Sequence, residues 1–217
     1  MKKQKSKEYS EKTNFSGKVQ FEFGFGLSYT DFTIDAEEAK VVKRDRETFI
    51  EIDVSVKNCG TSYAGKEVVQ VYVESPQGKL GKPAKVLAAF KKTKELQAGE
   101  SEHLTISFPV HSLAFYDDGG VTGHPSSYVL EAGKYNVFVG NSVRNLVNIN
   151  IGDMSSFELE ALEVEEQLEE VLAPTMSLKR MMPSRQKEDG TYELTYVDTP
   201  KQKVSLGERI EIGVRRC

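Results

Sequence analysis

Residues 49 to 58 read FIEIDVSVKN, and this stretch determines the fold class. Branched aliphatic side chains occupy every second position from 50 to 56, and polar side chains occupy the positions between them. A period of two is typical of a β-strand that buries one face and leaves the other in water. The stretch therefore predicts a half-buried strand.

Similar strand-like runs follow along the middle of the chain, each bounded by turn residues. They occupy residues 68–75, 86–96, 103–108, 113–117, 127–140 (two strands joined through EAG) and 145–152. Seven or more short strands without a helical period are typical of an antiparallel β-sandwich of roughly 100 residues. A parallel α/β fold is disfavoured because no crossover helices separate the strands.

The sandwich is expected to be of the immunoglobulin-like class without the immunoglobulin hallmarks. The chain has no tryptophan, and its two cysteines, Cys59 and Cys217, lie far apart. An all-β, fibronectin type III-like antiparallel sandwich therefore fits better than a disulfide-linked immunoglobulin domain. The period of two predicts its core to include Ile52, Val54, Val71, Ile106, Val137 and Val139.

Composition divides the 217 residues into three zones. Residues 1–20 are lysine-rich and polar, which predicts a disordered or truncated N-terminal segment. Residues 21–152 carry the sandwich pattern. Residues 153–217 are acidic and then proline-punctuated, which predicts an extended, irregular C-terminal tail with one short helix around residues 165–172.

Charge and composition narrow the function classes. The chain is 38% hydrophobic and 29% charged with a net charge of -4, which indicates a globular protein. Acidic residues outnumber basic ones and are interleaved with them, which argues against a nucleic-acid partner. No apolar run is long enough to predict a membrane span. The basic start MKKQKSK is not followed by an apolar stretch, so we expect no export signal and a cytoplasmic location.

Side chains that could carry chemistry are few. His103, His111 and His124 share no metal-ligand spacing, and neither cysteine joins them, so no metal site and no cofactor are predicted. The stretch from 155 to 174, SSFELEALEVEEQLEEVLAP, holds seven glutamates. A solvated acidic face explains this run better than a catalytic carboxylate pair. No catalytic residue is predicted in this chain.

Five spaced motifs carry a family resemblance. They are FEFGFGLSYTDF (21–32), VKNCGTSYAGKEVVQVYV (56–73), LAAFKKTKELQAGES (87–101), LAFYD (113–117) and LEAGKYNVFVGNS (130–142). In this order they resemble the fibronectin type III-like domain of glycoside hydrolase family 3, the β-glucosidases and β-xylosidases. The resemblance covers roughly residues 21–150.

The resemblance implies an accessory role. Family members carry the nucleophile on a (β/α)8 barrel and usually the acid/base on an α/β sandwich domain, and this chain has no counterpart of either motif. We therefore predict that the chain alone is inactive and that its partners are those two catalytic domains. The tail resembles the connector of permuted members, in which the barrel follows the fibronectin-like domain. This resemblance implies that the chain is a fragment or a truncated member of the permuted type. The alternative is a free-standing sandwich that binds glycans or a protein.

The resemblance also implies where the domains meet. In the family, the segment matching residues 21–32 leaves the α/β sandwich domain and enters the fibronectin-like domain. Gly24 and Gly26 would let the chain turn there. The remaining candidates for this interface are Phe21, Phe23, Phe25, Leu27 and Tyr29.

Without its partner, such a segment would expose a large apolar patch. Monomeric proteins seldom expose more than a few hundred Å² of contiguous apolar surface. The isolated chain is therefore expected to self-associate, to aggregate, or to fold its tail, residues 172–197, over the patch.

A second candidate site is the loop DDGGVTGHPSS, which begins with Asp117 and Asp118. Aspartate at the start of such a loop usually accepts hydrogen bonds from backbone N–H groups. Loops at the end of a sandwich can also carry function, so both residues are candidates for a rim that reaches a neighbouring domain.

Overall fold

The structure is a computed structural model that describes residues 20–152, 156–168, 177–188 and 192–198. The strands are β1 (Phe32–Arg44), β2 (Glu47–Asn58), β3 (Val68–Glu74), β4 (Val86–Lys92), β5 (Ser101–Pro109), β6 (Phe115–Asp117), β7 (Ser127–Leu130), β8 (Gly133–Ser142), β9 (Asn145–Ile149), β10 (Phe157–Leu159), β11 (Glu163–Gln167), β12 (Lys179–Gln186) and β13 (Tyr192–Asp198). A short 3-10 helix, η2 (Val110–Leu113), follows β5. Within the described residues, no helix is long and apolar enough to cross a membrane.

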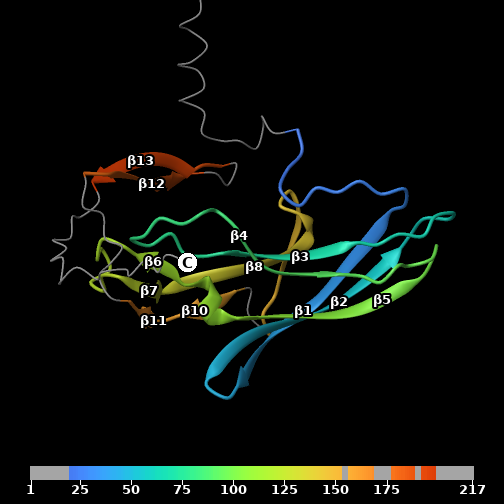
Figure 1. Ribbon diagram of the computed structural model, residues 1–217, viewed down its shortest axis with the longest axis horizontal. Helices are drawn as coiled ribbons and strands as arrows, with labels where there is room; N and C mark the ends of the chain where they lie inside the picture. The colour runs from blue at the N-terminus through green and yellow to red at the C-terminus, as the bar shows by residue number, and fades with distance from the viewer. Residues whose placement is uncertain (1–19, 153–155, 169–176, 189–191, 199–217) are drawn as a thin grey trace, which may run out of the picture.

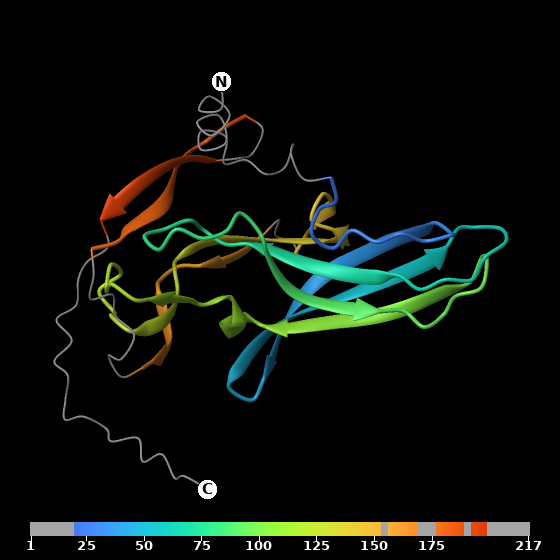
Figure 2. The same ribbon diagram turned by 45° about the horizontal axis from the view of Figure 1, so that its top comes forward.

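Two antiparallel sheets form the sandwich (Figures 1 and 2). The first has the order β1-β2-β5, and the second has the order β10-β8-β3-β4, with β9 also paired to β8. The two layers are joined at one edge by a parallel bridge between Ala39 and Ile151. The predicted all-β, fibronectin type III-like sandwich is confirmed.

The core lies between the sheets and follows the period of two. Ile52 pairs with Ala39 on β1 and with Ile106 on β5, and all three side chains are buried. The side chains predicted for the core are all buried: Ile52, Val54, Val71, Ile106, Val137 and Val139. Strand β3 departs from the simple pattern, because Gln70 and Tyr72 on its outer face are buried as well.

The acidic stretch is more ordered than a linker. Phe157–Leu159 form β10, which pairs with the first residues of β8 and so extends the second sheet. Glu163–Gln167 form β11, which pairs with β7 in a small sheet of order β11-β7-β6. The division of domains at residue 152 stays a prediction, but one strand after this point, β10, belongs to the second sheet of the sandwich.

The prediction of a short helix around residues 165–172 is wrong for its first three residues. Residues 165–167 lie in β11, because backbone pairing with Ser127–Leu130 outweighs the weak helical spacing of a glutamate-rich segment. Residues 169–172 lie outside the described residues.

Strands β12 and β13 pair with each other and form a separate hairpin over one end of the sandwich (Figure 1). The Arg180 guanidinium forms an ion pair with Asp118 in the loop that follows β6. Close to the same end, the side chain of Met182 on the hairpin contacts Gly81. The contact is so close that a Cβ added to Gly81 would lie 2.4 Å from the sulfur of Met182. The described part of the tail therefore returns to the sandwich.

A buried ion pair fixes the long connection between β3 and β4. Lys82 and Glu131 form this pair, with side chains only 1% and 7% exposed. The Glu131 carboxylate also accepts the backbone N–H of Lys79 at 2.6 Å, and the Lys82 ammonium donates to the carbonyl of Pro76 at 2.7 Å. Burial lowers the pKa of Lys82, and Glu131 opposes that shift.

Candidate functional site

Residues 21–29, which we call the aromatic ledge, lie along the outer face of the second sheet and are held there by backbone groups. The Phe23 carbonyl accepts a hydrogen bond from the Val143 N–H at 3.0 Å. The Gly24 carbonyl accepts a hydrogen bond from the Gln70 side chain at 3.1 Å, so the ledge covers the outer face of β3 at this point. The ledge is therefore anchored through its main chain.

Glu22 adds a side-chain anchor. Its carboxylate accepts a hydrogen bond from the Ser142 hydroxyl at 2.8 Å and forms an ion pair with Arg144 at 3.5 Å. A hydrogen bond from the backbone at Glu22, then the Ser142 hydroxyl and the charge of Arg144, lower the pKa of this carboxyl. The polar groups of the ledge thus face the sandwich.

The apolar side chains of the ledge face the opposite way, into solvent. Their exposed fractions lie between 43% and 91% for Phe21, Phe23, Phe25, Leu27 and Tyr29. The rings of Phe21 and Phe25 contact each other with centroids 4.9 Å apart. This arrangement inverts the usual order, in which apolar groups are buried and polar groups are solvated.

Tyr63 extends the ledge and was not among the predicted interface residues. Its ring lies 6.1 Å from the ring of Tyr29 and is 60% exposed. The buried side chain of Asn58 donates a hydrogen bond to the Tyr63 carbonyl at 2.9 Å, which fixes this loop. The sequence gives no local signal for this contact, because Tyr29 and Tyr63 are brought together only by the pairing of β1 with β2.

The tail does not cover the ledge in the described residues. The hairpin β12–β13 contacts Asp118 and Gly81 instead, and the rings of the ledge stay exposed. Of the three outcomes expected for the patch, cover by the described tail is wrong, while self-association and aggregation stay predictions.

The two glycines of the ledge differ in how strongly the structure requires them. Gly24 has φ +84°, and an added Cβ would lie 2.2 Å from the Gln70 side-chain oxygen. Gly26 has no positive φ and has open space around its Cα. Only Gly24 therefore needs to be glycine for the turn.

Gly24→Ala is expected to lower the free energy of unfolding by about 1–3 kcal/mol, or to detach the ledge from the sandwich, because alanine is strained at this positive φ. The matched control Gly26→Ala should change it by less than about 0.5 kcal/mol. Denaturant unfolding of both variants measures the difference. Equal effects at the two positions would show that the left-handed turn at Gly24 is not needed.

Asp117 has a structural role, as the turn pattern predicted. Its carboxylate is fully buried and accepts hydrogen bonds from the N–H of Val121 at 3.0 Å and from the N–H and hydroxyl of Thr122 at 2.8 and 2.6 Å. Asp118 instead pairs with Arg180 of the hairpin. Whether this rim loop also contacts a neighbouring domain stays a prediction.

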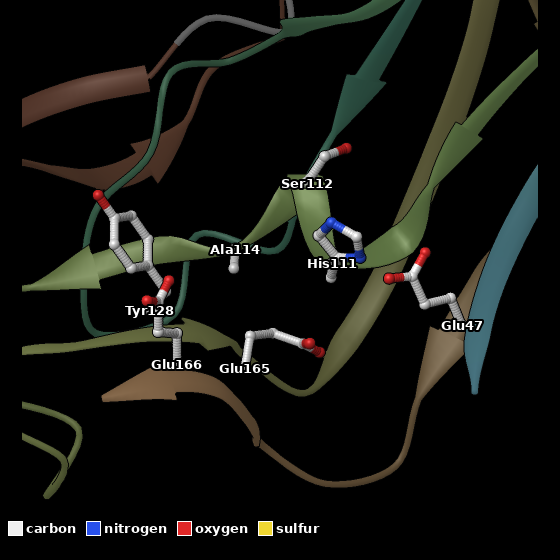
Figure 3. Close-up of a pocket in the computed structure, with 7 residues that line it drawn as sticks. All are labelled: Glu47, His111, Ser112, Ala114, Tyr128, Glu165 and Glu166. Atoms are coloured by element: carbon white, nitrogen blue, oxygen red, sulfur yellow. The ribbon is translucent and has the colours of Figure 1, made fainter. Parts of the chain in front are cut away.

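The surface also carries a groove beside η2, lined by Glu47, His111, Ser112, Ala114, Tyr128, Glu165 and Glu166 (Figure 3). Its carboxylates come from β2 and β11, which are far apart in the sequence. Among the described residues, no group of three or more His, Cys, Asp or Glu side chains could hold a metal ion.

Comparison with known proteins shows which proteins this chain is similar to. Residues 67–143 match the fibronectin type III-like domain family. The chain is 43% identical over 192 residues to a β-glucosidase of Ruminococcus albus, covering 88% of this chain and 18% of that enzyme. It is 40% identical over 187 residues to β-glucosidase A of Butyrivibrio fibrisolvens, covering 81% and 21% respectively.

A solved structure agrees with these similarities. The β-glucosidase from Paenibacillus barengoltzii superposes with a TM-score of 0.82 at 49% identity, covering 88% of this chain and 21% of that one. The chain thus spans about a fifth of the length of the proteins it matches. The β-sandwich is therefore a fibronectin type III-like domain, and the chain is similar to one part of these β-glucosidases.

Proposed function

We propose that this chain is the non-catalytic accessory domain of a family 3 glycoside hydrolase, and that it packs against the catalytic part of that enzyme through the aromatic ledge. In this role the sandwich contributes stability and fixes the geometry of its neighbours. The parent activity, which the names of the relatives suggest, is hydrolysis of β-glucosides.

The inverted polarity of the ledge carries this proposal. Backbone carbonyls and Glu22 bind the ledge to β3 and to the turn between β8 and β9, while its rings point outward. A segment that only closed the sandwich would bury its rings. Large apolar patches rimmed by polar groups mark sites of contact with another protein surface.

The relatives support a partner within the same polypeptide. About four fifths of each matched β-glucosidase lies outside the region that this chain covers. Interfaces between domains of one chain resemble ordinary protein interfaces, in which exposed aromatic residues supply much of the contact. The ledge with Tyr29 and Tyr63 supplies aromatic side chains of this kind.

The purified chain is expected not to hydrolyse 4-nitrophenyl β-glucoside or β-xyloside above the rate in buffer. Glycosidases need one carboxyl group held protonated by an apolar, water-shielded site. Glu47, Glu165 and Glu166 meet in the groove beside η2 but are exposed to solvent.

A discontinuous assay at high protein concentration measures this rate. Turnover that disappears in Glu47→Gln or Glu165→Gln would contradict the accessory role. Turnover that separates from the chain on gel filtration would be contamination and would leave the expected result standing.

A further inference from the structure

The groove beside η2 continues into a second depression along the first sheet. The two have volumes of about 470 and 620 Å³ and share Glu47, His111 and Glu165, so they form one groove. This size is within the range of small-molecule sites. One wall is the segment from β10 to β11, and the other includes the end of β1, the start of β2 and η2. Figure 3 shows the part of the groove that is lined by β11, η2 and the start of β2.

A β-bulge shapes the wall that β11 contributes to the groove. In the pairing of β11 with β7, Val164 lies opposite Val129 and Glu166 lies opposite Tyr128, so Glu165 is the extra residue. Consecutive side chains of a regular strand point to opposite faces, yet Glu165 and Glu166 both line the groove. Bulges redirect side chains in this way and are common beside functional sites.

An aromatic surface adjoins these carboxylates. Tyr128 is 39% exposed and lies directly opposite Glu166 on one side and Tyr116 on the other. The two tyrosine rings are 5.2 Å apart. The groove thus offers a ring face next to a row of hydrogen-bond acceptors.

Four polar side chains of the groove are free to bind, whereas the Ser112 hydroxyl donates a hydrogen bond to the Pro109 carbonyl at 2.7 Å. Among the described residues, no hydrogen bond or ion pair engages the side chains of Glu47, His111, Glu165 or Glu166. In other parts of the sandwich, by contrast, the carboxylates of Glu22 and Glu131 are held by hydrogen bonds.

We propose that this groove binds a neutral polyhydroxylated ligand, a carbohydrate, with one sugar ring against Tyr128 and its hydroxyl groups on Glu165, Glu166 and His111. Carboxylates only accept hydrogen bonds, which sugar hydroxyls donate, and an imidazole N–H donates to a hydroxyl oxygen. Six glutamates line the groove against Lys43 and Arg46, so an anion is repelled. A cation also suits the carboxylates and the aromatic face, but it leaves the histidine N–H donor unused, so a cationic probe is included in the test.

Nuclear magnetic resonance titration of the purified chain with cellobiose tests the proposal. We expect saturable shifts in the millimolar range that are confined to residues 111–114, 127–129 and 163–167. Tyr128→Ala should weaken binding about tenfold, because the ring face is lost. Glu166→Gln should weaken it about threefold while keeping the shape of the side chain.

Tyr196→Ala is the matched control, because Tyr196 is an exposed tyrosine on the hairpin β12–β13 and should not affect binding. Melting temperatures confirm that each variant is folded; if Tyr128→Ala is not, Glu166→Gln decides the question. Spermidine serves as the cationic probe. The proposal is overturned if cellobiose gives no saturable shifts in the groove, if Glu166→Gln binds it as the wild type does, or if spermidine binds the groove more tightly.

Discussion

Replacing Glu131 with alanine is expected to lower the free energy of unfolding by about 3–5 kcal/mol. The substitution leaves the Lys82 ammonium buried, with its side chain 1% exposed and, among the described residues, only the Pro76 carbonyl as a hydrogen-bond acceptor. It also removes the acceptor for the backbone N–H groups of Lys79 and Leu80. Urea unfolding monitored by circular dichroism measures the change.

The double variant Lys82→Met, Glu131→Leu tests how much of the lost stability is caused by the unpaired buried charge. An apolar pair of similar volume avoids the isolated buried charge, so we expect it to regain a large part of the lost stability. The backbone groups near residue 79 stay unsatisfied, which keeps the recovery incomplete. If Glu131→Ala alone cost less than about 1 kcal/mol, the ion pair would not be what holds the connection between β3 and β4.

Ile52→Ala is expected to destabilise the sandwich by about 2–5 kcal/mol, because it creates a cavity in the core between the two sheets. Ile52 is fully buried, and its neighbours across the strands, Ala39 and Ile106, cannot fill the space. Val147→Ala on the edge strand β9 is the control, since Val147 is 65% exposed. Thermal unfolding of both variants should show a large shift for the first and almost none for the second. Comparable shifts would place the core elsewhere.

The sequence predicts the sandwich because its period of two reports directly on burial. Ile52 and Val54 alternate with polar residues, and such a pattern specifies both the strand and its inward face. The same rule misses Gln70 and Tyr72. Their outer face is covered by a segment about 50 residues earlier in the chain, and no local pattern encodes that contact.

In the tail, pairing with a distant strand decides the secondary structure, and the local sequence pattern does not. Glu165 and Glu166 fit a helix as well as a strand in isolation, and pairing with β7 decides between them. The bulge that turns both side chains into the groove depends on this register and has no signature in the sequence. Tyr63 likewise reaches Tyr29 only through the folded arrangement.

The aromatic ledge could be predicted in part. Alternating rings and glycines indicated a turn with bulky apolar side chains, and the structure requires glycine at position 24. The anchors of the ledge, Ser142 and Gln70, lie far along the chain and could not be inferred. These anchors fix the ledge on the sandwich, which supports the proposed docking role.

The double variant Phe23→Ser, Phe25→Ser tests the docking role of the ledge most directly. These side chains are 65% and 43% exposed, so removing them should leave the melting temperature of the sandwich nearly unchanged. Light scattering should show that the wild-type chain self-associates or aggregates and that the variant shifts toward monomer. A collapse of the sandwich in the variant, or an identical monomeric state for both proteins, would contradict the ledge as an interdomain surface.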